Sequence, residues 1–394
     1  MVPVSEARLP AVAIVAAGVA TPLGPDLDSY WSGLVTGVDA ISGIERFPVG
    51  DLRVGRGGEI KKLAPLRHGA PPRCRASALL LHAADDLLSR AALTADRTRL
   101  AVVVGTALGG VEELERAMEE APGPRVAAAA LYDSPAHALA ERLAARGPVI
   151  TVSTACASGA TAMGVGADLL NADAADLVVA GGYDVLCRFV MRGFDALRSL
   201  TRERVRPFDR RRSGLLLGEA AGLVLLARER DASSRLGRLL GHASSSDGSH
   251  IAAPDPEGRG LEHALRGAMA AAGVGARDVD FVSAHGTGTP LNDRIETAVL
   301  KRVLGARAYD VPVNSIKAAL GHTMGAAATL EAIMCLLAAR DRVVPSTLGY
   351  EEPDPACDLD YVPRVPRHVR TRVSLSTSLG FGGCNAVLVL EGGG

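Results

Sequence analysis

The sequence predicts an α/β fold in which buried sheets are covered by helices. Three observations lead to this prediction. Runs rich in β-branched residues alternate along the chain with Ala- and Leu-rich runs of helical length. Hydrophobic residues make up 48% of the 394 residues, which is enough for a large core. Aromatic residues reach only 3%, so Ala, Val and Leu must fill most of that core.

The elements follow from these runs, with Gly- and Pro-containing turns between them. In the first part of the chain, strands are expected at residues 12–16, 100–104, 149–153, 177–180 and 222–226. In the second part they are expected at 238–244, 279–283, 311–314, 372–376 and 386–390. Helices are expected at 27–36, 76–91, 111–119, 134–145, 160–172, 260–272, 293–304 and 325–339.

The chain shows a weak internal repetition. In each part, a strand ends in a small-residue turn that carries a polar group, and a helix follows, as at Cys156, His285 and Lys317. We therefore expect two similar halves, residues 1–235 and 236–394, that form one compact unit.

Net charge and cysteine usage exclude several classes of protein. A net charge of −1 argues against binding to nucleic acid or to a membrane surface. Residues 1–19 lack the pattern of a signal peptide, and no apolar run is long enough to span a bilayer. The six cysteines are scattered without disulfide or metal-ligand spacing, so reduced thiols in a cytoplasmic protein are expected, with no metal site.

The segment VSTACASGA, residues 152–160, is the first candidate for chemistry. It places Cys156 between a predicted strand and a predicted helix, where the helix dipole and the free amides of the first turn favour a thiolate. Small neighbours would let an electrophile approach the sulfur. A buried structural cysteine is the alternative for this segment taken alone.

Two histidine motifs join this cysteine. His285 lies in AHGTGTPLND, directly after a short predicted strand, and His322 lies in NSIKAALGHTMGAA, five residues after Lys317. Either histidine alone could be a structural group. The two together, each in a glycine-lined polar turn, indicate a site.

A glycine-rich turn, LGFGGCNA at residues 379–386, surrounds Phe381 and precedes the last predicted strand. It is either a mobile turn whose amides face a cavity or a plain hairpin. Residues 105–110, GTALGG, lack the spacing of a dinucleotide fingerprint, and the chain has no Walker-type lysine motif.

These blocks, TACASG, AHGTGT and NSIKAALGHTMGAA, resemble those of the β-ketoacyl-acyl-carrier-protein synthases. The resemblance covers nearly the whole chain and includes GVATPLG, RPFD and the closing GFGG. It implies the thiolase fold, with two similar βα halves in layers αβαβα. It also implies a decarboxylative condensation of an acyl primer with malonyl-acyl-carrier protein, in fatty acid, polyketide or polyene synthesis.

The resemblance also implies a role for individual residues. Cys156 would carry the acyl chain, and the amides of Cys156 and Phe381 would form an oxyanion hole. His285 and His322 would stabilise the enolate, and Lys317 with Glu331 would organise the site. The remaining implied positions are Thr287 and Thr289 for the phosphopantetheine arm, Phe381 as a gate, and Leu108 as the limit of the acyl pocket at a dimer interface.

The resemblance further implies partners. An acyl carrier protein would deliver the substrate on phosphopantetheine, no cofactor would be bound, and the enzyme would pair with itself or with a paralogous subunit. Because carrier proteins are usually acidic, a local basic patch is expected to contact them. Its candidates are Arg67, Arg73, Arg75, Arg204, Arg206 and Arg210.

Three positions depart from the family pattern: Leu215, Ala220 and Cys384. None of them removes a catalytic group, but they leave the pocket shape and the chain length open. A non-catalytic chain-length-factor subunit is one alternative, and a non-decarboxylating acyltransferase is another. The first is disfavoured by the presence of Cys156, and the second by the presence of both histidines. A plain cysteine hydrolase would leave His322 and Lys317 without a role.

Overall fold

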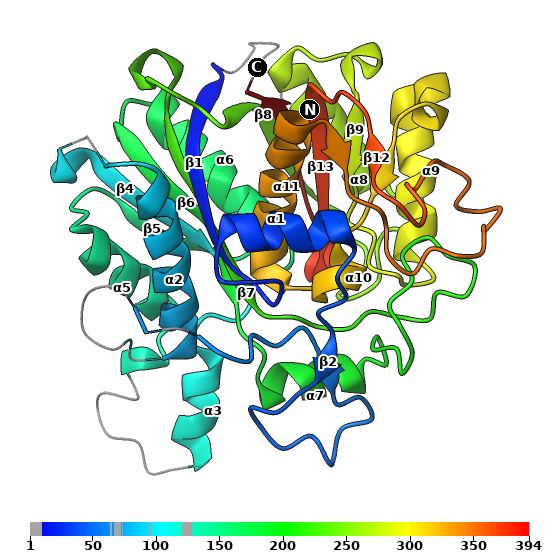
Figure 1. The fold of residues 1–394 in the computed structure, drawn as a ribbon, viewed down its shortest axis with the longest axis horizontal. Coiled ribbons are helices and arrows are strands. Elements are labelled where there is room, and N and C mark those ends of the chain that lie inside the picture. The colour runs from blue at the N-terminus through cyan, green and yellow to red at the C-terminus, as the bar shows by residue number, and fades with distance from the viewer. Residues whose placement is uncertain are drawn as a thin grey trace.

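The computed structural model describes residues 10–63, 65, 66, 72, 74–93, 96–119 and 128–393. Its centre is one mixed sheet with the strand order β10-β9-β13-β14-β8-β1-β7-β6-β4-β5 (Figure 1). The strands of the first part are β1 (Val12–Ala20), β4 (Leu100–Gly105), β5 (Val149–Val152), β6 (Leu177–Asp184) and β7 (Ala220–Arg228). Those of the second part are β8 (Gly237–Ser246), β9 (Phe281–Ser283), β10 (Val313–Asn314), β13 (Val373–Gly380) and β14 (Cys384–Gly392).

The two parts of this sheet are built alike. Counted along the chain within each part, the strands lie in the order third, second, fourth, fifth, first. The first three positions of that order are joined by parallel pairing and the others by antiparallel pairing, in both parts. The parts meet where Val12–Ile14 of β1 pair with Gly237–Leu239 of β8. The predicted boundary at residues 235 and 236 falls just before β8 and stays a prediction.

The longer helices are arranged in layers about the two parts of the sheet (Figure 1). Helices α2 (Arg75–Arg90) and α5 (Ser134–Leu143) pack on the outer face of the first part, and α8 (Arg259–Ala272) with α9 (Asn292–Leu304) on that of the second. Between the two parts lie α6 (Ser158–Asn171) and α11 (Ala327–Asp341). Every residue from Ala327 to Ala338 is buried, which the small Ala side chains allow. The layered α/β prediction is therefore confirmed.

All the strands and longer helices predicted from the sequence are present, with ends shifted by a few residues. The helix expected at 325–339 begins instead with a 3₁₀ turn, Met324–Ala326, before α11. Helix α7 (Arg188–Ala196) was not predicted; it has only nine residues and contains Gly193, so its helical signal in the sequence is short and interrupted. Further α-helices and strands among the described residues are α1 (Leu27–Thr36), α3 (Val111–Glu119), α10 (Lys317–Leu320) and the short pairs β2 (Ser42–Gly43) with β3 (Arg56–Gly57) and β11 (Val343–Val344) with β12 (Arg367–His368). No helix in the described part of the chain has the length and apolar character needed to cross a membrane.

Candidate active site

A cavity of about 530 Å³ brings the predicted chemical residues together. Cys156, His285 and His322 all line it, although more than 160 residues of chain separate the first from the last. Phe381, Thr287 and Thr289 line the same cavity. Each of these side chains lies in a turn that either follows a strand of the central sheet or precedes a helix.

The turn that carries Cys156 is sharply bent and tightly held. Ala155 has a φ of 50°, a left-handed conformation that non-glycine residues seldom adopt. Ser158 fixes this turn, because its hydroxyl accepts a hydrogen bond from the Thr154 amide at 2.9 Å and donates one to the Ala155 carbonyl at 2.5 Å. The bend leaves the Cys156 side chain on the cavity, at the entrance to helix α6.

The resting thiol is protonated. Burial raises the pKa of Cys156 to about 12, although the nearby Lys317 ammonium and the Phe381 amide lower it. The expectation that the helix dipole favours a resting thiolate is therefore wrong, because the loss of hydration outweighs the dipole at a buried sulfur. The Cys156 thiol therefore loses its proton only when a bound substrate reacts with the sulfur.

A buried carboxylate positions His285. Glu296 on α9 accepts hydrogen bonds from the backbone amides of His285 at 2.7 Å and Gly286 at 2.9 Å, and from the Thr377 hydroxyl at 2.6 Å. Glu296 is completely buried, and burial raises its pKa. Sequence reasoning did not identify Glu296; its place on a predicted helix eight residues after a glycine-rich turn was the available signal.

His322 is held through its main chain. Its amide donates to the Leu216 carbonyl at 2.7 Å, and its carbonyl accepts from the Gly218 amide at 2.9 Å. The preceding Gly321 has a φ of 77°, and a Cβ there would lie 2.4 Å from the Leu217 carbonyl oxygen. Only glycine fits this approach, so the turn fixes where the imidazole points.

Behind the histidines lies a buried ion pair between Lys317 and Glu331. Both side chains are about 1% exposed. Burial raises the pKa of Glu331 to about 7, against the pull of the Lys317 charge. The predicted pairing of these two residues is present in the structure.

The two imidazoles meet edge to face, with ring centroids 5.3 Å apart and planes inclined by 85°. Burial lowers the pKa of each ring well below its ordinary value, and the Lys317 charge lowers both further. Both rings are therefore neutral near pH 7. Among the described residues, Nδ1 of His285 and both ring nitrogens of His322 have no hydrogen-bond partner. A neutral imidazole carries one N–H, so each ring can donate a hydrogen bond to a substrate oxygen.

The turn after β13 closes against the cysteine. The Phe381 amide hydrogen-bonds to the Cys156 sulfur, and a Cβ at Gly380 would lie 3.1 Å from the Cys156 nitrogen. The Phe381 ring stacks on Phe194 of α7, with centroids 5.3 Å apart. Two backbone amides, those of Cys156 and Phe381, thus lie close to the reacting sulfur.

Two threonine hydroxyls form part of the cavity lining. The hydroxyls of Thr287 and Thr289 lie 3.0 Å apart, and both residues line the cavity. Leu215, one of the departures from the family pattern, lines it as well. Leu108 does not line this cavity; it packs against an apolar cluster that includes Val190, Met191 and Met324.

Asp184, at the end of β6, is a second residue that sequence reasoning missed. Its carboxylate accepts hydrogen bonds from the Thr106 hydroxyl at 2.7 Å and from the amides of Ala107, Leu108 and Gly325 at 2.8, 3.1 and 2.6 Å. It thereby joins the loop after β4 to the start of the central helix. A lone carboxylate at the end of an apolar strand was its only signal in the sequence.

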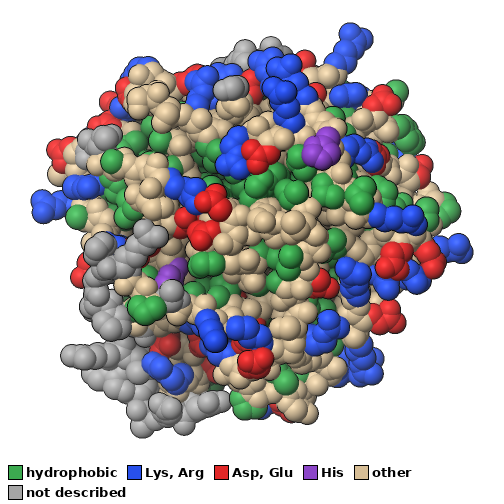
Figure 2. Space-filling view, viewed as in Figure 1, with side chains coloured by type: hydrophobic (Ala, Val, Ile, Leu, Met, Phe, Trp, Pro, Cys, Tyr) green, Lys and Arg blue, Asp and Glu red, His purple; other side chains and the backbone are tan. Residues whose placement is uncertain are grey.

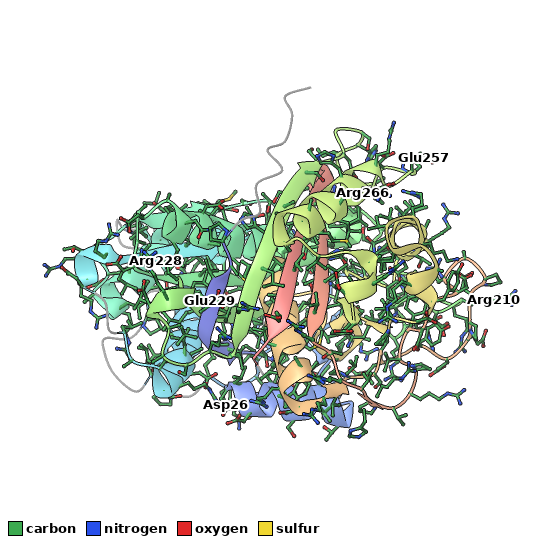
Figure 3. The ribbon with its side chains drawn as sticks, turned by 90° about the horizontal axis from the view of Figure 1, so that it is seen from above. Asp26, Arg210, Arg228, Glu229, Glu257 and Arg266 are labelled. Atoms are coloured by element: carbon green, nitrogen blue, oxygen red, sulfur yellow. The ribbon has the colours of Figure 1, made fainter. Side chains whose placement is uncertain are left out.

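The predicted basic patch is only partly available. Arg210 is exposed and projects from the edge of the molecule (Figure 3). Arg204 is half-buried, 3.7 Å from Asp39, and Arg206 pairs with Glu351 at 2.8 Å. Arg75 is bound internally to the buried Glu219, so it cannot contact a partner. Arg67 and Arg73 lie outside the described residues.

No group of three or more His, Cys, Asp or Glu side chains that could hold a metal ion occurs in the part of the chain that the structure describes. The polar groups around the cavity are mostly amides, hydroxyls, imidazoles and one thiol, and Arg198 and Asp247 add one charge of each sign. Such a set suits acyl transfer with an oxyanion intermediate.

Comparison with known proteins gives a consistent result over almost the whole chain. Residues 10–232 match the family model for the beta-ketoacyl synthase N-terminal domain, and residues 236–351 match that for the C-terminal domain. The chain is 36% identical to nodulation protein E of Rhizobium meliloti (strain 1021), covering 96% of this chain and 98% of that protein. It is also 36% identical to the tetracenomycin polyketide synthase ketoacyl synthase alpha subunit of Streptomyces glaucescens, covering 96% of each.

Among solved structures, the ishigamide ketosynthase/chain length factor superposes with a TM-score of 0.93 at 32% identity, covering 98% of this chain and 100% of that one. A type II polyketide ketosynthase in complex with its acyl carrier protein, AntDE:AntF, gives a TM-score of 0.89 at 26% identity, with 98% and 100% covered.

Proposed function

The chain belongs to the beta-ketoacyl synthase family, and on this premise we propose that it joins an acyl group held on Cys156 to a malonyl group delivered by an acyl carrier protein. It is a condensing enzyme of fatty acid or polyketide synthesis. The observation that carries the proposed mechanism is that Cys156, His285 and His322 open onto one cavity.

The first step loads the enzyme. The Cys156 sulfur attacks the thioester carbonyl of an acyl chain on phosphopantetheine, and the Cys156 proton ends on the departing phosphopantetheine sulfur. The amides of Cys156 and Phe381 stabilise the negative oxygen of the tetrahedral intermediate. Because the resting thiol is protonated, its proton leaves only as the new carbon–sulfur bond forms.

The second step makes the carbon nucleophile. The bond between the malonyl carboxylate and the α-carbon breaks, carbon dioxide leaves, and the electron pair passes into an enolate. N–H groups of His285 and His322 donate hydrogen bonds to the enolate oxygen. Their neutrality supports this role, since a neutral ring keeps its N–H while it stabilises the negative charge.

The third step forms the carbon–carbon bond. The enolate carbon attacks the acyl-Cys156 carbonyl, the carbon–sulfur bond breaks, and the sulfur takes up a proton from solvent. The product is a β-ketoacyl chain two carbons longer than the primer. Lys317 and Glu331 take no part in bond changes; their buried pair holds a positive charge close enough to act on both histidines.

The phosphopantetheine arm would enter past Thr287 and Thr289, whose hydroxyls can bond to its amides. Phe381 would act as the gate. The exposed Arg210, together with Arg204, is the best-supported contact for an acidic carrier protein, whereas Arg206 is held by Glu351. A cytoplasmic location stays a prediction of the sequence.

Carrier binding can be tested at Arg210. Arg210→Glu should raise the KM for an acyl-carrier substrate and leave the KM for a small acyl thioester unchanged. Arg277→Glu, at an exposed arginine of the 3₁₀ turn before β9, is the matched control for the change of charge. Equal effects of Arg210→Glu on both substrates would reject the contact.

A dimer through the edge strand β5 is supported by exposed groups beside it. Leu131 and Tyr132 are 60% and 41% exposed, and Tyr132 hydrogen-bonds to the Thr106 carbonyl beside Leu108. Leu108 would then limit the acyl pocket from the interface. Light scattering of the protein alone and with a paralogous subunit separates a homodimer from a heterodimer; a monomer in both would reject the dimer.

The condensation itself is tested by mass and gas measurement. Incubation with acyl-carrier proteins of several chain lengths should add one acyl mass at Cys156. Addition of malonyl-carrier protein should then release carbon dioxide and yield the β-ketoacyl product. Acylation without carbon dioxide release would instead assign the protein as an acyltransferase, and failure of acylation would favour a non-catalytic subunit.

A further inference from the structure

A second cavity, of about 400 Å³, lies at the end of the sheet away from the active site. Its lining contains six arginines, which are Arg235, Arg238, Arg340, Arg342, Arg370 and Arg372. They come from the start of β8, the end of α11 and the start of β13. Figure 2 shows Lys and Arg side chains along the top of the molecule, and Figure 1 marks the C-terminus at the same end.

The carboxylates at this cavity neutralise only part of that charge. Glu391 pairs with Arg238 and Arg372, and Glu229 pairs with Arg235 and Arg238. Figure 3, which views the molecule from this end, shows Glu229 near its middle. Asp341 pairs with Arg340 at 2.7 Å and also accepts a hydrogen bond from the Trp31 indole at 2.5 Å.

Two of the six arginines remain unpaired. Arg342 and Arg370 are exposed and form no ion pair with the residues that the structure describes. Arg342 ends helix α11 with a φ of 56°, so its backbone turns sharply at the rim of the cavity. Among the described residues, the six guanidinium groups have only three carboxylates as ion-pair partners, which leaves an excess of positive charge in a concave space.

A buried hydroxyl adds an independent indication of a ligand. Thr371 lines this cavity and is only 3% exposed, and its Oγ1 has no hydrogen-bond partner among the described residues. A buried hydroxyl without a partner destabilises the folded protein unless something else binds to it. An anion in the cavity would accept its hydrogen bond.

The geometry points to a binding site for a phosphate-bearing anion with two or more negative charges. Guanidinium groups bind phosphate oxygens in pairs, and Thr371 supplies a further donor. The remaining lining residues are Glu391, which is paired with Arg238 and Arg372, and Ala339, Gly392 and Gly393, so no large apolar side chain is present to hold an acyl chain or a base. The lining therefore fits free diphosphate better than a nucleotide.

This site is separate from the active site. Arg372 lies just before β13 and Phe381 just after it, so eight strand residues, about 26 Å, separate them. The inference does not rest on the proposed condensation, since the protein can bind an anion here whether or not it condenses.

The test is calorimetric titration of the full chain with inorganic pyrophosphate at fixed ionic strength, set with sodium chloride. Wild-type protein should bind with a definite stoichiometry. Arg342→Ala/Arg370→Ala should weaken binding at least about tenfold, because two charge-assisted contacts are lost. Arg146→Ala/Arg277→Ala removes two exposed arginines that do not line the cavity, and it should bind as the wild type does.

Thr371→Val separates binding from folding. It should weaken pyrophosphate binding several-fold while leaving the melting temperature unchanged or higher, because it removes an unpartnered buried hydroxyl. Titration with ADP in place of pyrophosphate distinguishes the free anion from its esters. If ADP bound more tightly than pyrophosphate, and Arg342→Ala/Arg370→Ala lost the ADP binding too, the same site would be assigned to a diphosphate ester. Absence of pyrophosphate binding by wild type, or equal losses in both double variants, would overturn the proposal.

Discussion

The ring of Phe381 stacks on the ring of Phe194, with centroids 5.3 Å apart and planes inclined by 26°. This contact ties the turn after β13 to helix α7, an element without any sequence signal of function. Because the Phe381 amide hydrogen-bonds to the Cys156 sulfur, the stack also fixes a donor beside the nucleophile. The cavity wall thus depends on two aromatic side chains 187 positions apart in the chain.

Loss of this stack should slow acylation. Phe194→Leu is expected to lower kcat/KM for acyl transfer to Cys156 by about 2- to 10-fold, because aromatic stacking contributes about 0.5–1.5 kcal/mol beyond burial. Phe189→Leu, on the same helix but 58% exposed, is the control and should transfer acyl groups like the wild type. Equal rates in all three proteins would show that the stack does not position the turn.

The raised pKa of Cys156 predicts how it reacts with iodoacetamide. With its pKa raised to about 12 by burial, the thiolate fraction should grow about tenfold per pH unit from pH 7 to 10, without a plateau. The rate is measured by mass spectrometry of the Cys156 peptide. A Cys384→Ser background is used because, among the described residues, Cys384 is half-buried and the other five cysteines are buried.

Lys317→Met should slow the reaction further at each pH, because the Lys317 charge lowers the pKa of Cys156. A plateau below pH 8 in the wild type would mean that the resting sulfur is already a thiolate, contrary to this account.

The Lys317–Glu331 pair should govern stability as well as activity. Glu331→Gln leaves the buried ammonium without a counter-charge and is expected to lower the free energy of unfolding by about 3–5 kcal/mol. Lys317→Met/Glu331→Leu removes both charges and should recover most of that loss in urea unfolding, while remaining inactive. A single variant as stable as the wild type would show that the pair is not desolvated as described.

Asp184 gives the protein a specific dependence on pH. Burial raises the pKa of its carboxyl from an ordinary value of 3.8 to about 6, so the folded state binds a proton more tightly than the unfolded state. The stability from this group is therefore complete below about pH 4 and is lost as the pH rises through about 6. The difference in unfolding free energy between wild type and Asp184→Asn should fall by up to about 3 kcal/mol over that range.

Urea titrations at several pH values measure this difference for Asp184. A difference that stays constant from pH 4 to pH 7, or that grows with pH, would contradict the assignment.

Much of the fold and the reacting groups could be predicted from local pattern. Strand β4 is a run of five buried apolar residues, and α11 is an Ala-rich helix with the single charge Glu331 in its buried part, so each was visible in the sequence. Cys156, His285 and His322 were identifiable because each lies in a small-residue turn beside a strand or helix.

The residues that were missed act at long range. Asp184 binds amides at positions 107, 108 and 325, and Glu296 binds the amides of His285 and Gly286 from another element. Nothing local to either carboxylate reveals these partners. The protonation of Cys156 was mispredicted for the same reason, because its degree of burial depends on packing between distant segments.

The most direct test of the central claim measures carbon dioxide release from malonyl-carrier protein by three variants. If both imidazoles stabilise the enolate, His285→Ala and His322→Ala should each lose release by about 100-fold or more, the cost of removing one preorganised donor. Cys156→Ala should still release carbon dioxide while forming no β-ketoacyl product. The account would be contradicted if Cys156→Ala abolished the release while either histidine variant retained it.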